Sequence, residues 1–247
     1  MSAVSLAAPS RGVTLGVLLF AMTFPSVVAW LYFVVLATGG SENPAQQWTY
    51  TLGKVVQFGT PVVFLTLVDR RWPRFLRPHR RGMGLGLAFG LAVAAAMLGL
   101  YFGLLRGSSA LEKTPAELLK KLQELGCAAP ARYLLLALFI SLVHSLLEEY
   151  YWRWFVFGRL RELIPWGWAL VLSSLGFMGH HVIVLHVYLP ERFLTEVVPF
   201  SLAIAVGGGV WAWLYERTGT LYPSWLSHAM VDAMIFVIGW DLVRQTL

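Results

Sequence analysis

Long apolar segments separated by short polar stretches make up most of this 247-residue chain. A helix needs about 20 mostly apolar residues to cross a bilayer. Seven segments approach or exceed that length, and we expect their bounds at residues 13–37, 48–67, 83–105, 131–157, 165–188, 197–215 and 221–243. This pattern predicts an all-α fold, a polytopic membrane helix bundle with these seven segments as transmembrane helices.

Polar residues and prolines interrupt some of these segments. The first one, which follows Arg11, is longer than the apolar region of a signal peptide, about 7–15 residues, so we expect an uncleaved first span. Lys54 and Gln57 interrupt the second segment. A lysine at such a place either extends toward the lipid headgroups or faces the interior of the bundle. Pro25 and Pro199 lie inside spans, where proline bends a helix.

Composition supports the membrane assignment. The chain is 57% hydrophobic and 13% charged, about half the charged fraction of a soluble domain. Its net charge of +6 comes from arginines gathered in loops, which the positive-inside rule explains without any nucleic acid. The single cysteine, Cys127, excludes an intrachain disulfide and a cysteine-based metal site.

Loop charges predict the orientation of the spans. Residues 69–81 contain six arginines, whereas residues 38–47 contain no lysine or arginine. Positive loops stay in the cytoplasm, so we expect a cytoplasmic N-terminus and, after seven spans, an external C-terminus. The short loops suggest a prokaryotic cell membrane.

Residues 107–130 differ from the rest of the chain. Their leucines alternate with glutamates and lysines at the spacing of an amphipathic helix that starts near Thr114-Pro115. This helix is either a solvated connector or an interfacial helix on the membrane surface. We therefore divide the chain into residues 1–130, the N-terminal spans with this connector, and residues 131–247, a second group of spans, within one integrated membrane domain.

Two adjacent carboxylates, Glu148 and Glu149, lie within the fourth apolar segment. A charged group in a membrane helix costs several kcal/mol unless it is paired, neutralised or hydrated. His144 and Glu148 fall on one face of the helix, while Glu149 and Arg153 fall on the neighbouring face. Glu149 is then paired with Arg153, which leaves Glu148 freer to act as a base. The alternative is an acidic cluster, paired with arginine, that only stabilises the bundle.

Two later segments also carry polar residues in helical register. Phe177 and His181 share a face of the fifth, whereas His180 points about 100° away. In the seventh, Ser224, His228 and Asp232 follow one another at intervals of four residues. We discount a serine-protease triad, because one straight helix keeps the serine about 12 Å from the aspartate. We expect Ser224 to bond to its own helix instead.

These three groups together resemble the CPBP family, which comprises CAAX proteases and bacteriocin-processing enzymes and is also called the Abi family. The family pattern is Glu-Glu-x-x-x-Arg, then Phe-x-x-x-His, then His-x-x-x-Asn or a similar residue. It matches residues 148–153, 177–181 and 228–232 here. The second motif selects His181 over His180.

The resemblance implies an intramembrane endopeptidase whose catalytic core is residues 131–247. It implies that Glu148 activates water, that Glu149 and Arg153 support it, and that His181 and His228 complete the site. Asp232 stands where the family often has asparagine, a residue thought to help stabilise the oxyanion. A charged aspartate would repel an oxyanion, so Asp232 is expected to be protonated or to serve His228.

The expected partners are a membrane-associated protein or peptide substrate and the lipid bilayer, with no nucleic acid. We expect no cofactor, since an activated water and a polarised carbonyl suffice for peptide hydrolysis. The alternative is zinc bound by Glu148, His181 and His228. Two non-enzymatic functions also fit these residues. One is a proton-coupled transporter that uses the buried groups as a relay, and the other is a non-catalytic immunity or scaffold member of the family.

Overall fold

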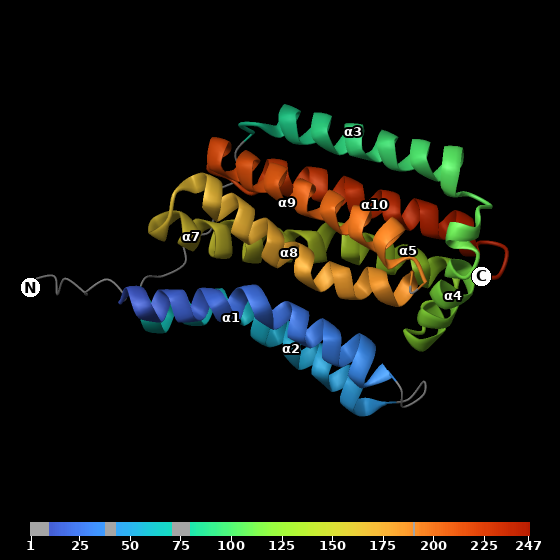
Figure 1. Ribbon diagram of the computed structural model, residues 1–247, viewed down its shortest axis with the longest axis horizontal. Coiled ribbons are helices and arrows are strands. Elements are labelled where there is room, and N and C mark those ends of the chain that lie inside the picture. Colours follow the sequence, from blue (N-terminus) through green and yellow to red (C-terminus); the bar gives the residue numbers. More distant parts are fainter. Residues whose placement is uncertain (1–9, 38–42, 71–79, 190) are drawn as a thin grey trace, which may run out of the picture.

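The computed structural model describes residues 10–37, 43–70, 80–189 and 191–247, and every regular element within them is helical (Figure 1). Seven helices are long and apolar enough to cross a membrane, with bounds Arg11–Val35, Pro44–Val68, Met83–Leu105, Pro130–Leu163, Trp166–Tyr188, Phe193–Thr218 and Tyr222–Val243. They coincide with the seven predicted segments. The all-α, polytopic fold is confirmed, and the chain is an integral membrane protein.

Each of the first three spans ends in a turn of π-helix. Helix α1 (Arg11–Trp30) continues as η1 (Leu31–Val35), α2 (Pro44–Val63) as η3 (Phe64–Val68), and α3 (Met83–Leu100) as η4 (Tyr101–Leu105). The side chains of Ser10 and Asn43 accept hydrogen bonds from the first amides of α1 and α2, which satisfies donors that a helix start leaves unpaired.

The fourth span is one long helical segment that alternates between α and π turns. It runs through α5 (Pro130–Leu138), η6 (Phe139–His144), α6 (Ser145–Glu149), η7 (Tyr150–Phe157) and α7 (Gly158–Leu163). The glutamate pair ends the short α6 element. Turns of π-helix inside α-helices are frequent at functional sites, because the extra residue shifts the direction of the side chains that follow.

The last three spans complete the bundle. They are α8 (Trp166–Tyr188), α9 (Val198–Thr218), which follows the short η8 (Phe193–Val197), and α10 (Tyr222–Val243). Helix α10 packs against α3 and α9, while α8 packs between α9 and α1, and α1 pairs with α2 (Figure 1). Because α9 begins at Val198, Pro199 lies in its first turn and does not interrupt it.

Helices α3 and α10 approach closely because glycines face the contact. A Cβ atom on Gly86 would lie 2.9 Å from Cα of Pro223, and one on Gly90 would lie 3.1 Å from Cα of Ser227. Glycine permits this close backbone contact between membrane helices. The contact supports the half of α10 that carries His228.

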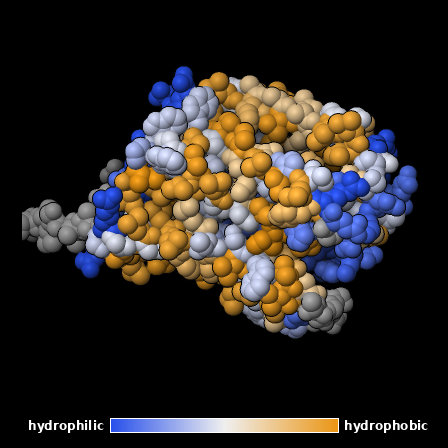
Figure 2. All heavy atoms as spheres, viewed as in Figure 1, coloured by the Kyte–Doolittle hydropathy of each residue, from blue (hydrophilic) through white to orange (hydrophobic). Residues whose placement is uncertain are grey.

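The amphipathic helix is α4 (Thr114–Glu124), as the leucine spacing predicts. Its Leu122 is buried in a small cluster with Tyr133 and Val243, so its apolar face packs against the end of the bundle. The Lys121 ammonium group lies 4.6 Å from the centre of the Tyr32 ring. Figure 2 shows hydrophilic atoms gathered at both ends of the long axis, including the end where α4 lies, and hydrophobic atoms across the middle.

The orientation prediction rests on a loop that is only partly described. Arg71, Arg74 and Arg77 lie outside the described residues. The cytoplasmic N-terminus therefore stays a prediction from the arginine distribution.

Candidate functional site

Both glutamates of the pair are buried in the interior of the bundle. Glu148 is 3% exposed and Glu149 is 0% exposed. Each carboxylate must therefore find compensating charge or hydrogen bonds from the protein. The two side chains find them in different places, because neighbouring positions on a helix face about 100° apart.

Glu149 is held by one cation and one histidine. Its Oε1 lies 3.3 Å from Nη1 of Arg153 and accepts a hydrogen bond of 2.8 Å from Nδ1 of His228. The predicted pairing of Glu149 with Arg153 is present. Arg153 is itself buried, with its guanidinium carbon 4.5 Å from the centre of the Phe177 ring and 5.0 Å from that of Trp211. This group ties the fourth span to α8, α9 and α10.

Among the described residues, the charged-group contacts of Glu148 are with imidazoles. Its Oε1 lies 3.3 Å from Nε2 of His144 and 3.5 Å from Nε2 of His180, and its Oε2 lies 3.7 Å from Nε2 of His228. No lysine or arginine forms an ion pair with it among the described residues. Imidazoles, and no permanent cation, therefore contact this carboxylate among the described residues.

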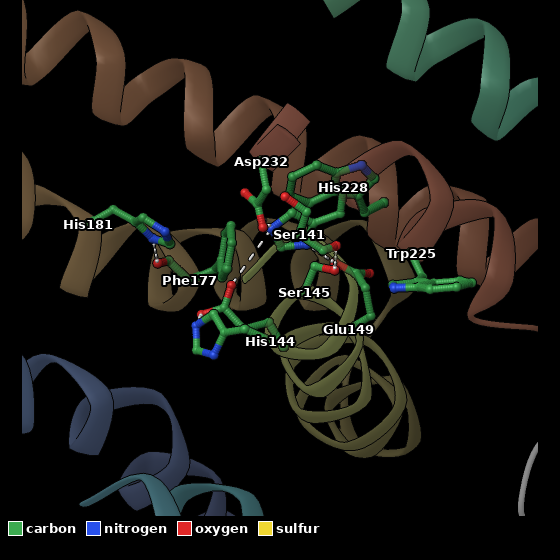
Figure 3. A network of polar contacts seen from close by, with 12 residues as sticks. Ser141, His144, Ser145, Glu149, Phe177, His181, Trp225, His228 and Asp232 are labelled. Atoms are coloured by element: carbon green, nitrogen blue, oxygen red, sulfur yellow. Dashed lines mark hydrogen bonds and ion pairs between the residues drawn. The ribbon is translucent and has the colours of Figure 1, made fainter. Parts of the chain in front are cut away.

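His228 connects the two carboxylates. Its ring stacks on Trp211, with centroids 4.1 Å apart and an angle of 14° between the planes. The Trp211 indole donates a hydrogen bond of 2.7 Å to Ser227. With Nδ1 bonded to Glu149, Nε2 of His228 is directed to the space where both Glu148 and Asp232 lie at 3.7 Å. Figure 3 shows Asp232 and His228 on α10 beside the fourth span.

The two histidines of α8 are placed differently from the sequence expectation. Nδ1 of His181 donates a hydrogen bond of 2.9 Å to the carbonyl of Phe177 in its own helix (Figure 3). It is His180, which the family motif passes over, that approaches Glu148. The His180 ring lies parallel to Trp152, with centroids 6.2 Å apart. The two histidine rings lie only 4.0 Å apart, because side chains of this length converge even when their Cα atoms face apart.

Two other residues depart from the sequence reasoning. Ser224 donates a hydrogen bond to the carbonyl of Trp211 on α9 and not to its own helix, and it is fully buried. His144 was placed on the face of Glu148 but was given no part in the site, although the i, i+4 spacing was the signal that could have found it.

Glu148, His181 and His228 are the ligands of the zinc alternative that the sequence leaves open. Across the described ranges, no group of three or more histidine, cysteine, aspartate or glutamate side chains could hold a metal ion. The hydrogen bond from Nδ1 of His181 to the Phe177 carbonyl leaves Nε2 of that ring available. As they lie here, Glu148, His181 and His228 are not grouped as a metal site among the described residues.

Comparison with known proteins agrees with the motifs. Residues 130–234 match the family model of type II CAAX prenyl endopeptidase Rce1-like proteins. No curated protein and no solved structure matches the chain. The matched segment contains all three motifs and indicates a CAAX-type intramembrane protease. It confirms the resemblance to the CPBP family of CAAX proteases over residues 130–234.

Proposed function

We propose that the protein is an intramembrane endopeptidase in which Glu148 activates the attacking water. One observation carries the proposal: Glu148 is a buried carboxylate with three imidazole nitrogens within 3.7 Å. Its neighbour Glu149 is already engaged by Arg153 and His228. The two glutamates thus differ in what they can do, and only Glu148 is available to exchange a proton.

The proposed reaction needs no group beyond these side chains and one water. Glu148 takes a proton from the water as its oxygen attacks the peptide carbonyl, and the carbonyl becomes a tetrahedral oxyanion. In the doubly protonated form of His228, Nδ1 donates to Glu149 and Nε2 is placed to donate a hydrogen bond to that oxyanion. Glu148 then returns the proton to the leaving amine, and the bond between carbon and nitrogen breaks. This restores Glu148 as a carboxylate.

Glu149, Arg153 and Asp232 act as positioning residues in this scheme. The bond from Nδ1 of His228 to Glu149 fixes the ring and leaves Nε2 to face the reacting atoms. Asp232 lies against the same Nε2 at 3.7 Å, which supports a role in serving His228. His181 enters from the family motif, and its proposed part is to complete the wall of the site next to His180.

The proposed substrate is a membrane-associated protein or peptide that reaches Glu148 from the bilayer. We propose a prokaryotic cell membrane as the location, with the N-terminus in the cytoplasm. Comparing the membrane proteomes of cells with the wild-type protein and with Glu148→Gln tests the proposal. New protein termini that appear only with the wild type support it, and identical sets of termini contradict it.

We also propose that the reaction uses no metal. Purified active protein in lipid nanodiscs should contain less than stoichiometric zinc, and a strong chelator should leave its activity unchanged. Stoichiometric zinc, together with activity that the chelator removes and zinc restores, would show instead that the site rearranges around a metal.

A further inference from the structure

Lys54 on α2 is a charged residue that the reaction above does not use. Its ammonium group lies 3.3 Å from Oε1 of Gln57 and 5.5 Å from the centres of the Tyr50 and Phe58 rings. Gln57 is 1% exposed, so this face of α2 is turned into the protein. The lysine therefore faces the interior of the bundle, which is one of the two alternatives that its place in an apolar segment leaves open.

The depth of Lys54 excludes the other alternative. It follows Pro44, the first residue of a 25-residue helical span, by ten positions, which is about 15 Å along a helix axis. The far end, Val68, is fourteen positions away, about 21 Å along the axis. A lysine side chain cannot reach the headgroups from the middle of a span. A cation at that depth is costly and marks a functional site unless it is compensated.

The same face of α2 borders the proposed site. The Phe58 ring lies 6.0 Å from the ring of His144 and 6.2 Å from that of Tyr151, and Tyr150 donates a hydrogen bond of 3.4 Å to the Phe58 carbonyl. Nε2 of His144 in turn lies 3.3 Å from Oε1 of Glu148. Lys54 thus lies near Glu148, on the side of the site that α2 forms.

In the described part of the chain, no carboxylate is in contact with Lys54. Of the ion pairs between described residues, none includes it. Its contacts are one amide oxygen and two aromatic faces. These groups hold the ammonium group in place. They leave at least one of its three N–H donors free for another acceptor.

We propose that Lys54 binds a carboxylate of the peptide substrate on the α2 side of Glu148. This inference rests on the proposed protease function and adds a specificity-determining residue to it. The carboxylate belongs either to the C-terminus of the peptide or to an acidic side chain beyond the cleaved bond. Lys54 touches neither the attacking water nor the cleaved carbonyl, so its loss should weaken binding of acidic substrates and leave the chemistry intact.

The test uses three libraries of lipid-anchored, internally quenched peptides that are identical except at the C-terminal end. One ends in a free carboxylate, one in an amide, and one in an amide with an aspartate at the penultimate position. Cleavage is measured in nanodiscs for the wild type, Lys54→Met and Lys54→Arg. Lys120→Met is the matched control, since Lys120 is an exposed lysine of α4.

The wild type should cleave one acidic library about tenfold better than the plain amide, the size of one charge-assisted hydrogen bond. Lys54→Met should abolish that preference through KM while kcat and cleavage of the amide stay the same. Lys54→Arg and Lys120→Met should keep it. The library that carries the preference identifies the source of the carboxylate. The proposal is overturned if the wild type and Lys54→Met prefer the acidic libraries equally. It is also overturned if Lys54→Met loses cleavage equally on all three libraries.

Binding gives a readout that is independent of cleavage. Affinity for the free-acid and amide libraries is measured with Glu148→Gln and with Glu148→Gln/Lys54→Met, neither of which should cleave. If Glu148→Gln prefers the free acid and the added Lys54→Met removes that preference, carboxylate binding is supported. This holds even if the wild type cleaves none of the libraries. In that case the protease function fails and the anion site stands. If each variant binds the free-acid and amide libraries with equal affinity, the anion site is contradicted and the protease function is not.

Discussion

Nδ1 of His228 donates a 2.8 Å hydrogen bond to Oε1 of Glu149, the same oxygen that lies 3.3 Å from Nη1 of Arg153. This relationship joins the fourth span to α10 at the depth of Glu148. It fixes which ring nitrogen of His228 faces the reacting atoms, since the other is already bonded. A helix that carries two adjacent glutamates can in this way supply one carboxylate for the reaction. The other carboxylate orients a side chain on a neighbouring helix.

The two glutamates should respond differently to the same substitution. Glu148→Gln keeps the shape of the side chain and removes the base, so we expect a folded protein that cleaves at least about 100-fold more slowly. Glu149→Gln leaves the buried Arg153 guanidinium without its carboxylate, which costs about 3–5 kcal/mol. We expect a lower melting temperature together with reduced activity.

Activity and thermal unfolding in nanodiscs, measured on both variants, distinguish these effects. Arg153→Ala is the control for the second, because it removes the other member of the same buried pair. A stable Glu149→Gln protein, or a Glu148→Gln protein with near-normal turnover, would show that the two roles are assigned to the wrong residues.

His144 should act as a positioning residue for Glu148. Its Nε2 lies 3.3 Å from Oε1 of that carboxylate, one helical turn away. We expect His144→Ala to lower kcat by about tenfold, the effect of one hydrogen bond to a charged group, and to shift the pH dependence of kcat. His144→Gln, which retains a donor, should recover part of the rate.

His186 provides the matched control for this substitution, since it is an exposed histidine of the fifth span that contacts Phe193. His186→Ala should leave both the rate and the pH profile unchanged. Equal losses in His144→Ala and His186→Ala would point to a general effect on helix packing.

The contact between α3 and α10 should tolerate no added side chain. A Cβ atom on Gly86 would lie 2.9 Å from Cα of Pro223, whereas one on Gly84 would meet nothing within 4 Å. We expect Gly86→Ala to destabilise the protein by about 1–3 kcal/mol through overpacking. Gly84→Ala should be neutral or slightly stabilising, because alanine favours the helix. Melting temperatures of the two variants provide the test, and equal values would contradict the close contact.

The spans and one ion pair of the candidate site could be predicted from the sequence, because both depend on short-range patterns. Membrane spans follow from runs of apolar residues, and the pairing of Glu149 with Arg153 follows from an interval of four residues on one helix. The seven helices and this pair were found in that way.

The contacts between spans could not be predicted, because they depend on how helices rotate against one another. Periodicity places His180 and His181 on different faces, but it cannot say which face meets the fourth span. The same limit applies to Ser224, whose partner is a carbonyl of α9, and to Lys54, whose inward direction depends on the packing of α2. A helical wheel gives the angles within one helix only.

His180 and His181 should therefore be separated by experiment. The family motif selects His181, whereas Nε2 of His180 lies 3.5 Å from Oε1 of Glu148 and His181 is bonded to the carbonyl of Phe177. If the contact with Glu148 decides which histidine takes part in catalysis, His180→Ala should lower kcat by at least about tenfold. His181→Ala should then affect mainly stability, because the hydrogen bond of His181 is to a carbonyl of its own helix. Both variants should be compared for kcat, KM and melting temperature in the same nanodiscs. A full loss of kcat in His181→Ala with unchanged stability, beside an active His180→Ala, would show that the ring of His181 turns into the site when substrate binds.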